Sequence, residues 1–134
     1  MPLQKVCPVV LRTSFAGRDI LAFQHPLAGH QLVKGTLEAG ETPAEAALRE
    51  LAEEAGICGT ASADLGSSAD IDSGQIWHFV QVDTDVLSEN WVFETADDGG
   101  HRFAFFWWPL QSEPGLDWHY AYARALGHIR KALA

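Results

Sequence analysis

Residues 38–54 hold six glutamates, and three of them have a spacing that could bind a cation. The six are Glu38, Glu41, Glu45, Glu50, Glu53 and Glu54, with Arg49 as the one base among them. On a helix, Glu50, Glu53 and Glu54 share one face, where like charges repel unless water or a cation lies between them. A solvated acidic face is one interpretation. The other is a site for a hard divalent cation, Mg²⁺ with Mn²⁺ as the alternative, because no histidine or cysteine spacing indicates zinc.

The loop before this segment adds two features that suit phosphate chemistry. Residues 34–41, KGTLEAGE, contain two glycines and lead directly into the expected helix. Gly35 permits close approach of the backbone, and its carbonyl can serve as another oxygen ligand. Lys34 places a positive charge beside the acidic face, where an anionic substrate needs one. Loop and helix together predict a site for a metal ion and a small phosphorylated molecule.

These residues resemble a known sequence motif. Read from Gly35, the segment GTLEAGETPAEAALRELAEEAGI is similar to the Nudix box, G-x5-E-x7-R-E-U-x-E-E-x-G-U, in which U is aliphatic. The fixed letters fall on Gly35, Glu41, Arg49, Glu50, Glu53, Glu54 and Gly56, and the aliphatic positions on Leu51 and Ile57. The resemblance implies an α/β fold, the Nudix-type α/β/α sandwich with a mixed β-sheet. It also implies an enzyme that hydrolyses a nucleoside diphosphate linked to another group, through attack by water on phosphorus.

The resemblance also implies roles for individual residues. The metal ligands would be Glu50, Glu53 and Glu54, with the Gly35 carbonyl as a further ligand. Arg49 would orient Glu53, and Glu41 would support the loop or bind metal through water. The general base stays open between Glu53, the default, and an acid outside the box. The outside candidates are Glu89, Glu94, Asp97 and Asp98, with Glu94 preferred, and residues 97–100 also have the composition of a plain turn.

The favoured substrate is a nucleoside or deoxynucleoside triphosphate, (d)NTP, or a dinucleoside polyphosphate. Lys34–Gly35 is similar to the lysine–glycine pair before the box in polyphosphate-cleaving Nudix members, although Val33 stands where those have proline. Lys34 is therefore a predicted substrate-binding residue. Trp91 and Phe93 are predicted to stack on a nucleobase. An alternative substrate is another diphosphate, such as a nucleotide sugar, and an alternative function is a nucleotide-binding sensor without turnover.

Secondary-structure signals place the box between strands. Strands are expected at 6–11, 19–25, 75–83 and 101–108, with a hairpin loop at 13–18 and a short extended piece at 31–33. Trp77 and Phe79 alternate within one of these strands and are expected in the sheet core.

Two helices are predicted. The first spans 43–55, with Thr42 as N-cap, Glu45 completing a capping box and Gly56 as its C-terminal stop. Its buried side is expected to carry Leu48, Leu51, Ala52 and Ala55. The second helix is expected at 117–133, with Asp117 as N-cap.

Composition and charge limit the class of protein. The 134 residues suit a single Nudix domain, 1–134, and a hydrophobic share of 47% indicates a globular fold. A formal net charge of -9 argues against extended nucleic acid or an anionic membrane as a partner. No apolar stretch reaches the ~20 residues of a membrane helix, and Cys7 and Cys58 match no zinc spacing. We therefore expect a cytoplasmic monomer or homodimer that acts on a nucleotide.

Overall fold

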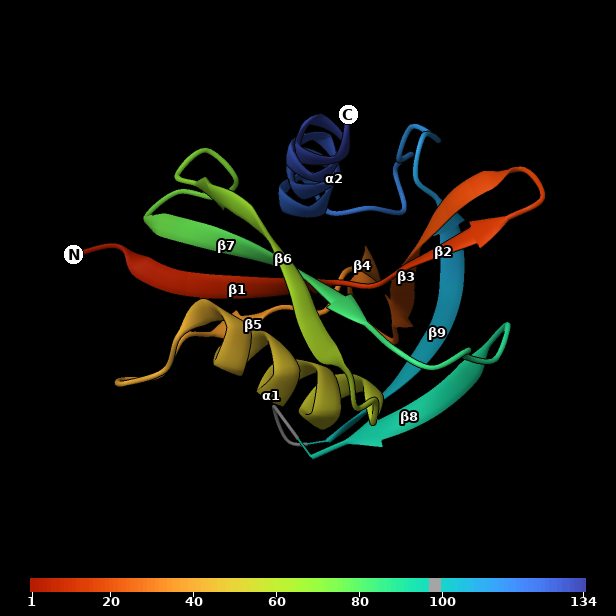
Figure 1. The fold of residues 1–134 in the computed structure, drawn as a ribbon, viewed down its shortest axis with the longest axis horizontal. Helices are drawn as coiled ribbons and strands as arrows, with labels where there is room; N and C mark the ends of the chain where they lie inside the picture. Colours follow the sequence, from red (N-terminus) through yellow and green to blue (C-terminus); the bar gives the residue numbers. More distant parts are fainter. Residues whose placement is uncertain (97–99) are drawn as a thin grey trace.

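The central strands divide their side chains between two apolar cores. In β1 (Leu3–Val9), Val6 packs in one core and Cys7 in the other, and Leu21 and Ile20 of β3 (Gly17–His25) are divided in the same way. A sheet that is apolar on both faces needs a cover on each. The computed structural model describes residues 1–96 and 100–134 and shows one helix on either side of the strands (Figure 1).

Two sheets form the middle layer. Their other strands are β2 (Leu11–Ser14), β4 (Gly29–Gln31), β5 (Gly35–Thr36), β6 (Thr60–Ser68), β7 (Gln75–Asp83), β8 (Trp91–Thr95) and β9 (His101–Pro109). One sheet has the order β5-β1-β7-β6, and the other has the order β2-β3-β9-β8 with β4 paired to β3. β1 and β7 are parallel, whereas the other pairs are antiparallel. The sheet structure is therefore mixed, as predicted.

The helices α1 (Pro43–Ala55) and α2 (Tyr120–Leu133) close the two cores. Leu51 of α1 packs with Val6, and Ile129 of α2 packs with Trp77 and Phe79, both of which are fully buried. In Figure 1 the two helices lie on opposite sides of the strands. The predicted α/β/α sandwich is confirmed.

The ends of α1 agree with the prediction. The Thr42 hydroxyl accepts a hydrogen bond from the Glu45 amide at 3.1 Å, and the Glu45 carboxylate accepts one from the Thr42 amide at 2.9 Å. This reciprocal pair is the capping box. Gly56 ends the helix with φ 70°, a left-handed conformation that favours glycine. Local residue chemistry thus determines where the box helix begins and ends.

The buried side of α1 is only partly the one predicted. Leu51 and Ala55 are buried as expected, but Ala52 is exposed and Leu48 is half-buried. The remaining buried residues are Ala46, Ala47 and Glu50. The buried stripe is rotated toward Glu50 because the Gly35 backbone of β5 lies against that side chain.

Several strand boundaries also differ from the prediction. β6 was not predicted, because its sequence, TASADLGSS, is small and polar, and pairing with β7 makes it a strand. β8 was not predicted as a strand either, and it is formed by pairing with β9. The expected strand 6–11 is divided between β1 and β2, and the expected loop 13–18 is a tighter turn between β2 and β3. The short extended piece predicted at 31–33 ends earlier, as β4.

The second helix begins later than predicted. It starts at Tyr120, and its N-cap is His119, whose side chain accepts a hydrogen bond from the Ala121 amide. The Asp117 carbonyl instead accepts a hydrogen bond from the His30 amide at 2.8 Å, which holds this segment beside β4. No helix in the described ranges is long and apolar enough to span a membrane.

Leu51→Ala should lower the free energy of unfolding by about 2–5 kcal/mol, because the truncation leaves a cavity in a packed core. Leu51 is 1% exposed. Leu116→Ala is the matched control, since Leu116 is fully exposed and should change stability by less than about 0.5 kcal/mol. Urea denaturation measures both variants. Equal midpoints for Leu51→Ala and wild type would contradict the burial assigned to α1.

Candidate active site

Arg49 of α1 joins the loop and the helix of the box. Its guanidinium donates hydrogen bonds to both carboxylate oxygens of Glu41, at 2.7 and 2.9 Å. It also donates to Glu50 Oε1 at 2.8 Å and to the Thr36 carbonyl at 2.9 Å. Glu53 is the most distant of these hydrogen-bond partners, at 3.3 Å. The predicted contact between Arg49 and Glu53 is present, but Arg49 holds Glu41 and Glu50 more closely.

Glu41 lies where the loop meets this arginine. Its carboxylate accepts a hydrogen bond from the Glu38 amide at 2.9 Å in addition to those from Arg49. The Arg49 hydrogen bond is the main cause of a pKa for Glu41 lowered to about 2, and the Glu38 amide adds to the effect. The ionised carboxylate therefore holds the loop in shape, which matches the supporting role predicted for it.

Glu50 is the buried carboxylate of the site and lies directly against Gly35. The residue is 6% exposed. A Cβ atom at Gly35 would lie 1.8 Å from the carboxyl carbon of Glu50, so only glycine leaves room for this side chain. Burial raises the pKa of Glu50, while hydrogen bonds with Glu54 and Arg49 act in the opposite direction. Two carboxyl groups and a glycine backbone thus meet at one place.

This group of oxygens suits a hard divalent cation. Glu50, Glu54 and the Gly35 backbone offer oxygen ligands alone, which is the set that Mg²⁺ prefers. A cation also offsets the cost of burying one carboxylate beside another. Glu53, the third predicted carboxylate ligand, lies 3.3 Å from Arg49 Nη1, and its role as a ligand stays a prediction. Within residues 1–96 and 100–134, no three histidine, cysteine, aspartate or glutamate side chains are grouped as a metal cluster.

Glu54 also lines a cavity of about 260 Å³, and Lys34 lines the same cavity. The Lys34 ammonium lies 5.3 Å from the centre of the Trp77 ring and 5.9 Å from that of Tyr122. Burial lowers the pKa of Lys34. The Lys34 ammonium, close to two aromatic rings, and the Glu54 carboxylate therefore line one cavity. A positive charge and a carboxylate of the kind that binds metal are the groups that a phosphorylated ligand needs.

Comparison with known proteins agrees with this geometry. Residues 3–126 match the NUDIX domain family, a range that includes Gly35, the glutamates of the box and Lys34. The chain belongs to this family. The sequence-based expectation of a Nudix hydrolase is thereby confirmed. No curated protein matches the chain.

Solved Nudix structures share the fold at low sequence identity. An ADP-ribose pyrophosphatase from Streptococcus suis 89-1591 has a TM-score of 0.72 and 14% identity, over 99% of this chain and 92% of that chain. The NUDIX domain of Shewanella oneidensis NrtR, complexed with ADP ribose, has a TM-score of 0.71 and 16% identity, over 100% and 90%. The C. elegans Ap4A hydrolase has a TM-score of 0.63 and 18% identity, over 100% of both chains. These likenesses show the fold.

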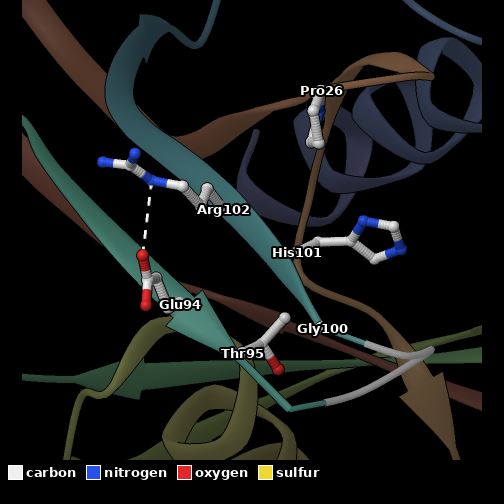
Figure 2. Close-up of a pocket in the computed structure, with 6 residues that line it drawn as sticks. All are labelled: Pro26, Glu94, Thr95, Gly100, His101 and Arg102. Carbon is white, nitrogen blue, oxygen red and sulfur yellow. Dashed lines mark ion pairs between the residues drawn. The ribbon is translucent and has the colours of Figure 1, made fainter.

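Glu94 does not line the cavity that contains Glu54. In Figure 2, Glu94 and Arg102 lie on one side of the β8–β9 pair, whereas His101 points to the other side. Glu94 Oε1 is 3.5 Å from Arg102 Nε, and both side chains are exposed beside a second cavity of about 440 Å³. His101 lines both cavities, and the catalytic role of Glu94 stays a prediction.

Of the other acids predicted as outside candidates, Glu89 lies in an ion-pair network. Glu89 forms an ion pair with Arg12 at 2.7 Å, and Arg12 also binds the buried Asp19 at 3.0 Å. That network holds β2 and the segment before β8 together. Asp97 and Asp98 lie outside the described residues.

The rings of Trp91 and Phe93 pack against the Nudix helix. Trp91 stacks on Phe105 with ring centres 5.0 Å apart, and its Nε1 donates to the Ala55 carbonyl at 3.4 Å. A Cβ atom at Gly56 would lie 2.5 Å from the Phe93 ring. These are the contacts of packing residues at the end of α1, and the nucleobase-stacking role of the two half-buried rings stays a prediction.

Five residues that line the cavity were not among the predicted site residues. They are His25, Gln31, His101, Phe103 and Tyr122. They come from β3, β4, β9 and α2, and the pairing of β3 with β4 and β9 brings the strand residues together. No spacing in the sequence connects them, so a motif search has no signal with which to find them.

Glu41→Gln should destabilise the protein at neutral pH and have less effect in acid. The pKa of Glu41 in the folded protein, about 2, is lower than its ordinary value of 4.5. The ionised carboxylate therefore stabilises the fold above pH 4.5, and this contribution is lost as the pH falls from 4.5 toward 2.

Urea denaturation from neutrality down to about pH 2 measures this difference. Glu113→Gln is the control, since its side chain is 88% exposed. A stability difference between wild type and Glu41→Gln that stays constant over this range would contradict the ion pair with Arg49.

Proposed function

We propose that this Nudix protein is a Mg²⁺-dependent pyrophosphohydrolase that cleaves a nucleoside diphosphate linked to another group. The proposed substrate is a (d)NTP or a dinucleoside polyphosphate. The observation that carries the proposal is the meeting of Gly35, Glu50 and Glu54, with Lys34 lining the same cavity as Glu54. Metal-binding oxygens and a cation close together provide the charge stabilisation that phosphoryl chemistry requires.

The carboxylates of Glu50 and Glu54 and the Gly35 carbonyl would hold the divalent cation. When bound, such a cation neutralises phosphate charge and lowers the pKa of an attacking water. Lys34 binds phosphoryl oxygens from within the cavity, where its partial burial strengthens the attraction. Mn²⁺ is the alternative ion, because it accepts the same oxygen ligands.

Glu53 is the proposed general base. Its side chain is 43% exposed, so water can reach the carboxylate. Arg49, which is itself held by Glu41, donates to Glu53 Oε2 and limits the positions that this carboxylate can take. Glu53 would accept the proton of the water that attacks phosphorus, while Arg49 keeps its orientation.

ADP-ribose belongs among the candidate substrates. The Streptococcus suis structure is an ADP-ribose pyrophosphatase, and the Shewanella oneidensis domain is complexed with ADP ribose. A nucleotide-binding sensor without turnover is the second candidate function. The presence of every glutamate of the box favours turnover over sensing, because a sensor has no need of the complete catalytic set.

Glu53→Gln should lower kcat by orders of magnitude with the fold intact, because the general base is lost. Glu94→Gln is the matched control and should change kcat by less than about threefold, since Glu94 is not among the residues that line the cavity with Glu54. The measurement is phosphate or pyrophosphate release from a panel of (d)NTPs, dinucleoside polyphosphates, nucleotide sugars and ADP-ribose with Mg²⁺.

Two results of this panel would contradict the proposal. If wild type and Glu53→Gln are equally inactive on every compound, the protein is not a hydrolase of this class. If Glu94→Gln loses as much activity as Glu53→Gln, the general base lies outside the box. Circular dichroism of each variant shows whether its fold is retained.

Gly35→Ala should weaken metal binding and activity together. The new methyl group would overlap the Glu50 carboxyl group, which must then move away from the loop. Gly115→Ala is the control, because a Cβ atom there meets no neighbour within 4 Å. Mn²⁺ titration followed by electron paramagnetic resonance measures the affinity directly. Wild-type Mn²⁺ affinity in Gly35→Ala would exclude the Gly35–Glu50 contact as part of the metal site.

A further inference from the structure

The cavity lined by Lys34 and Glu54 is too small to enclose a whole nucleotide. Its volume is about 260 Å³, whereas pockets that enclose drug-sized ligands range from about 300 to about 1,000 Å³. Three of the rings that line it pack on one another: the His25 ring centre lies 4.8 Å from that of His101 and 5.3 Å from that of Phe103. The nucleoside of a substrate whose phosphates occupy this cavity therefore lies outside it, on a neighbouring surface.

Two exposed aromatic side chains stand at the start of α2. His119 is the N-cap of this helix, and Tyr120 is its first residue. Both side chains are exposed, and Tyr120 is 51% exposed although it is a large ring. Their ring centres are 4.2 Å apart, with an angle of 36° between the planes. The two rings thus form one aromatic surface that solvent and ligands can reach.

Tyr122 connects this aromatic surface to the cavity. The Tyr122 ring centre lies 6.4 Å from that of His119. The same ring lies 5.9 Å from the Lys34 ammonium, and both residues line the cavity. The cation proposed to bind phosphate and the exposed rings therefore lie on either side of one tyrosine. Since a nucleotide carries its phosphates and its base at opposite ends of the sugar, one molecule can reach both.

Neighbouring residues hold the two exposed rings in place. The Tyr120 hydroxyl donates a hydrogen bond to Asp72 Oδ1 at 2.7 Å, and the Arg124 guanidinium lies 5.0 Å from the centre of the Tyr120 ring. His119 Nδ1 accepts a hydrogen bond from the Ala121 amide at 3.2 Å. Rings that are positioned before a ligand arrives lose little conformational entropy when the ligand stacks on them.

A planar ligand group with a π-face is the complement of such rings, and in a nucleotide that group is the base. We propose that the base of the substrate stacks on His119 and Tyr120 while its phosphates lie in the cavity with Lys34. Trp91 and Phe93, for which stacking is predicted from the sequence, are half-buried instead. This inference rests on the proposed function, because it assumes a nucleotide substrate whose phosphates occupy the cavity.

Isothermal titration calorimetry can separate the base from the phosphates. The ligands are the α,β-methylene diphosphates of adenosine, guanosine, cytidine and uridine, in which the methylene group prevents cleavage, and methylenediphosphonate, which has no nucleoside. With Mg²⁺ present, the wild type should bind at least one of the four nucleotides about fivefold or more tightly than methylenediphosphonate, as expected for stacking of one base. Equal affinity for all five compounds, or no binding of any, would overturn the inference.

Three variants test the two rings with the nucleotide that binds most tightly. Tyr120→Phe keeps the ring without its hydroxyl and should bind like wild type, whereas Tyr120→Ala should lose at least about fivefold in affinity. His119→Asn removes the other ring, retains a residue that can cap the helix, and should lose affinity as well. All three should bind methylenediphosphonate like wild type, because the cavity is unchanged. Loss in only one of Tyr120→Ala and His119→Asn would support stacking on that ring alone.

Phe15→Ala is the matched control, because Phe15 is a fully exposed ring in the turn between β2 and β3. It should change neither affinity. Wild-type nucleotide affinity in both Tyr120→Ala and His119→Asn, or an equal loss for methylenediphosphonate, would overturn the inference. Calorimetry measures binding whether or not turnover occurs, so failure of the hydrolase proposal leaves this result interpretable. Conversely, a hydrolase that binds nucleotide equally well without these rings would keep its proposed function.

Discussion

In this site several carboxylates lie close together, and the positive charge of Arg49 offsets their repulsion. Its five N–H donors reach Glu41, Glu50, Glu53 and the Thr36 carbonyl, so one side chain links the loop to the helix. Glu41 completes the link by accepting the Glu38 amide. A lysine offers a single point charge and could not make these contacts at once. The loop conformation and the position of the buried Glu50 both follow from this hub.

The two sheets contribute the other half of the site. The box supplies acidic groups and the Gly35 backbone, whereas β3, β4, β9 and α2 supply the side chains that complete the cavity around Lys34 and Glu54. Under the proposed function, this division would let a chain with a net charge of -9 bind a phosphorylated substrate. The acid is concentrated on α1, where a cation can neutralise it, and the Lys34 ammonium belongs to the segment between β4 and β5. The net charge alone reveals neither the acidic face of α1 nor the position of Lys34.

Local signals made parts of this structure predictable. The limits of α1 follow from Thr42, Glu45 and Gly56, which act within one turn of the helix and do not depend on the rest of the chain. The strand Gln75–Asp83 was predicted with its observed limits, because its β-branched and aromatic residues are typical of a buried strand. β6 could not be found in this way, since its small polar residues form a strand only through pairing with β7. The same holds for the exposed Ala52, whose surroundings depend on how α1 packs.

The amino-acid sequence was sufficient to identify the Nudix box, the glutamates that can bind metal and the helix that carries them, because all of these lie within one short segment with regular geometry. It could not decide which carboxylate is buried, where Glu94 points, or which side chains complete the cavity. Those properties depend on contacts between residues far apart in the chain, such as Gly35 with Glu50 and Tyr122 with Gln31. The pairing of β5 with β1 places Gly35, and the pairing of β3 with β4 and β9 places the strand residues of the cavity; sheet register is a property of the folded chain.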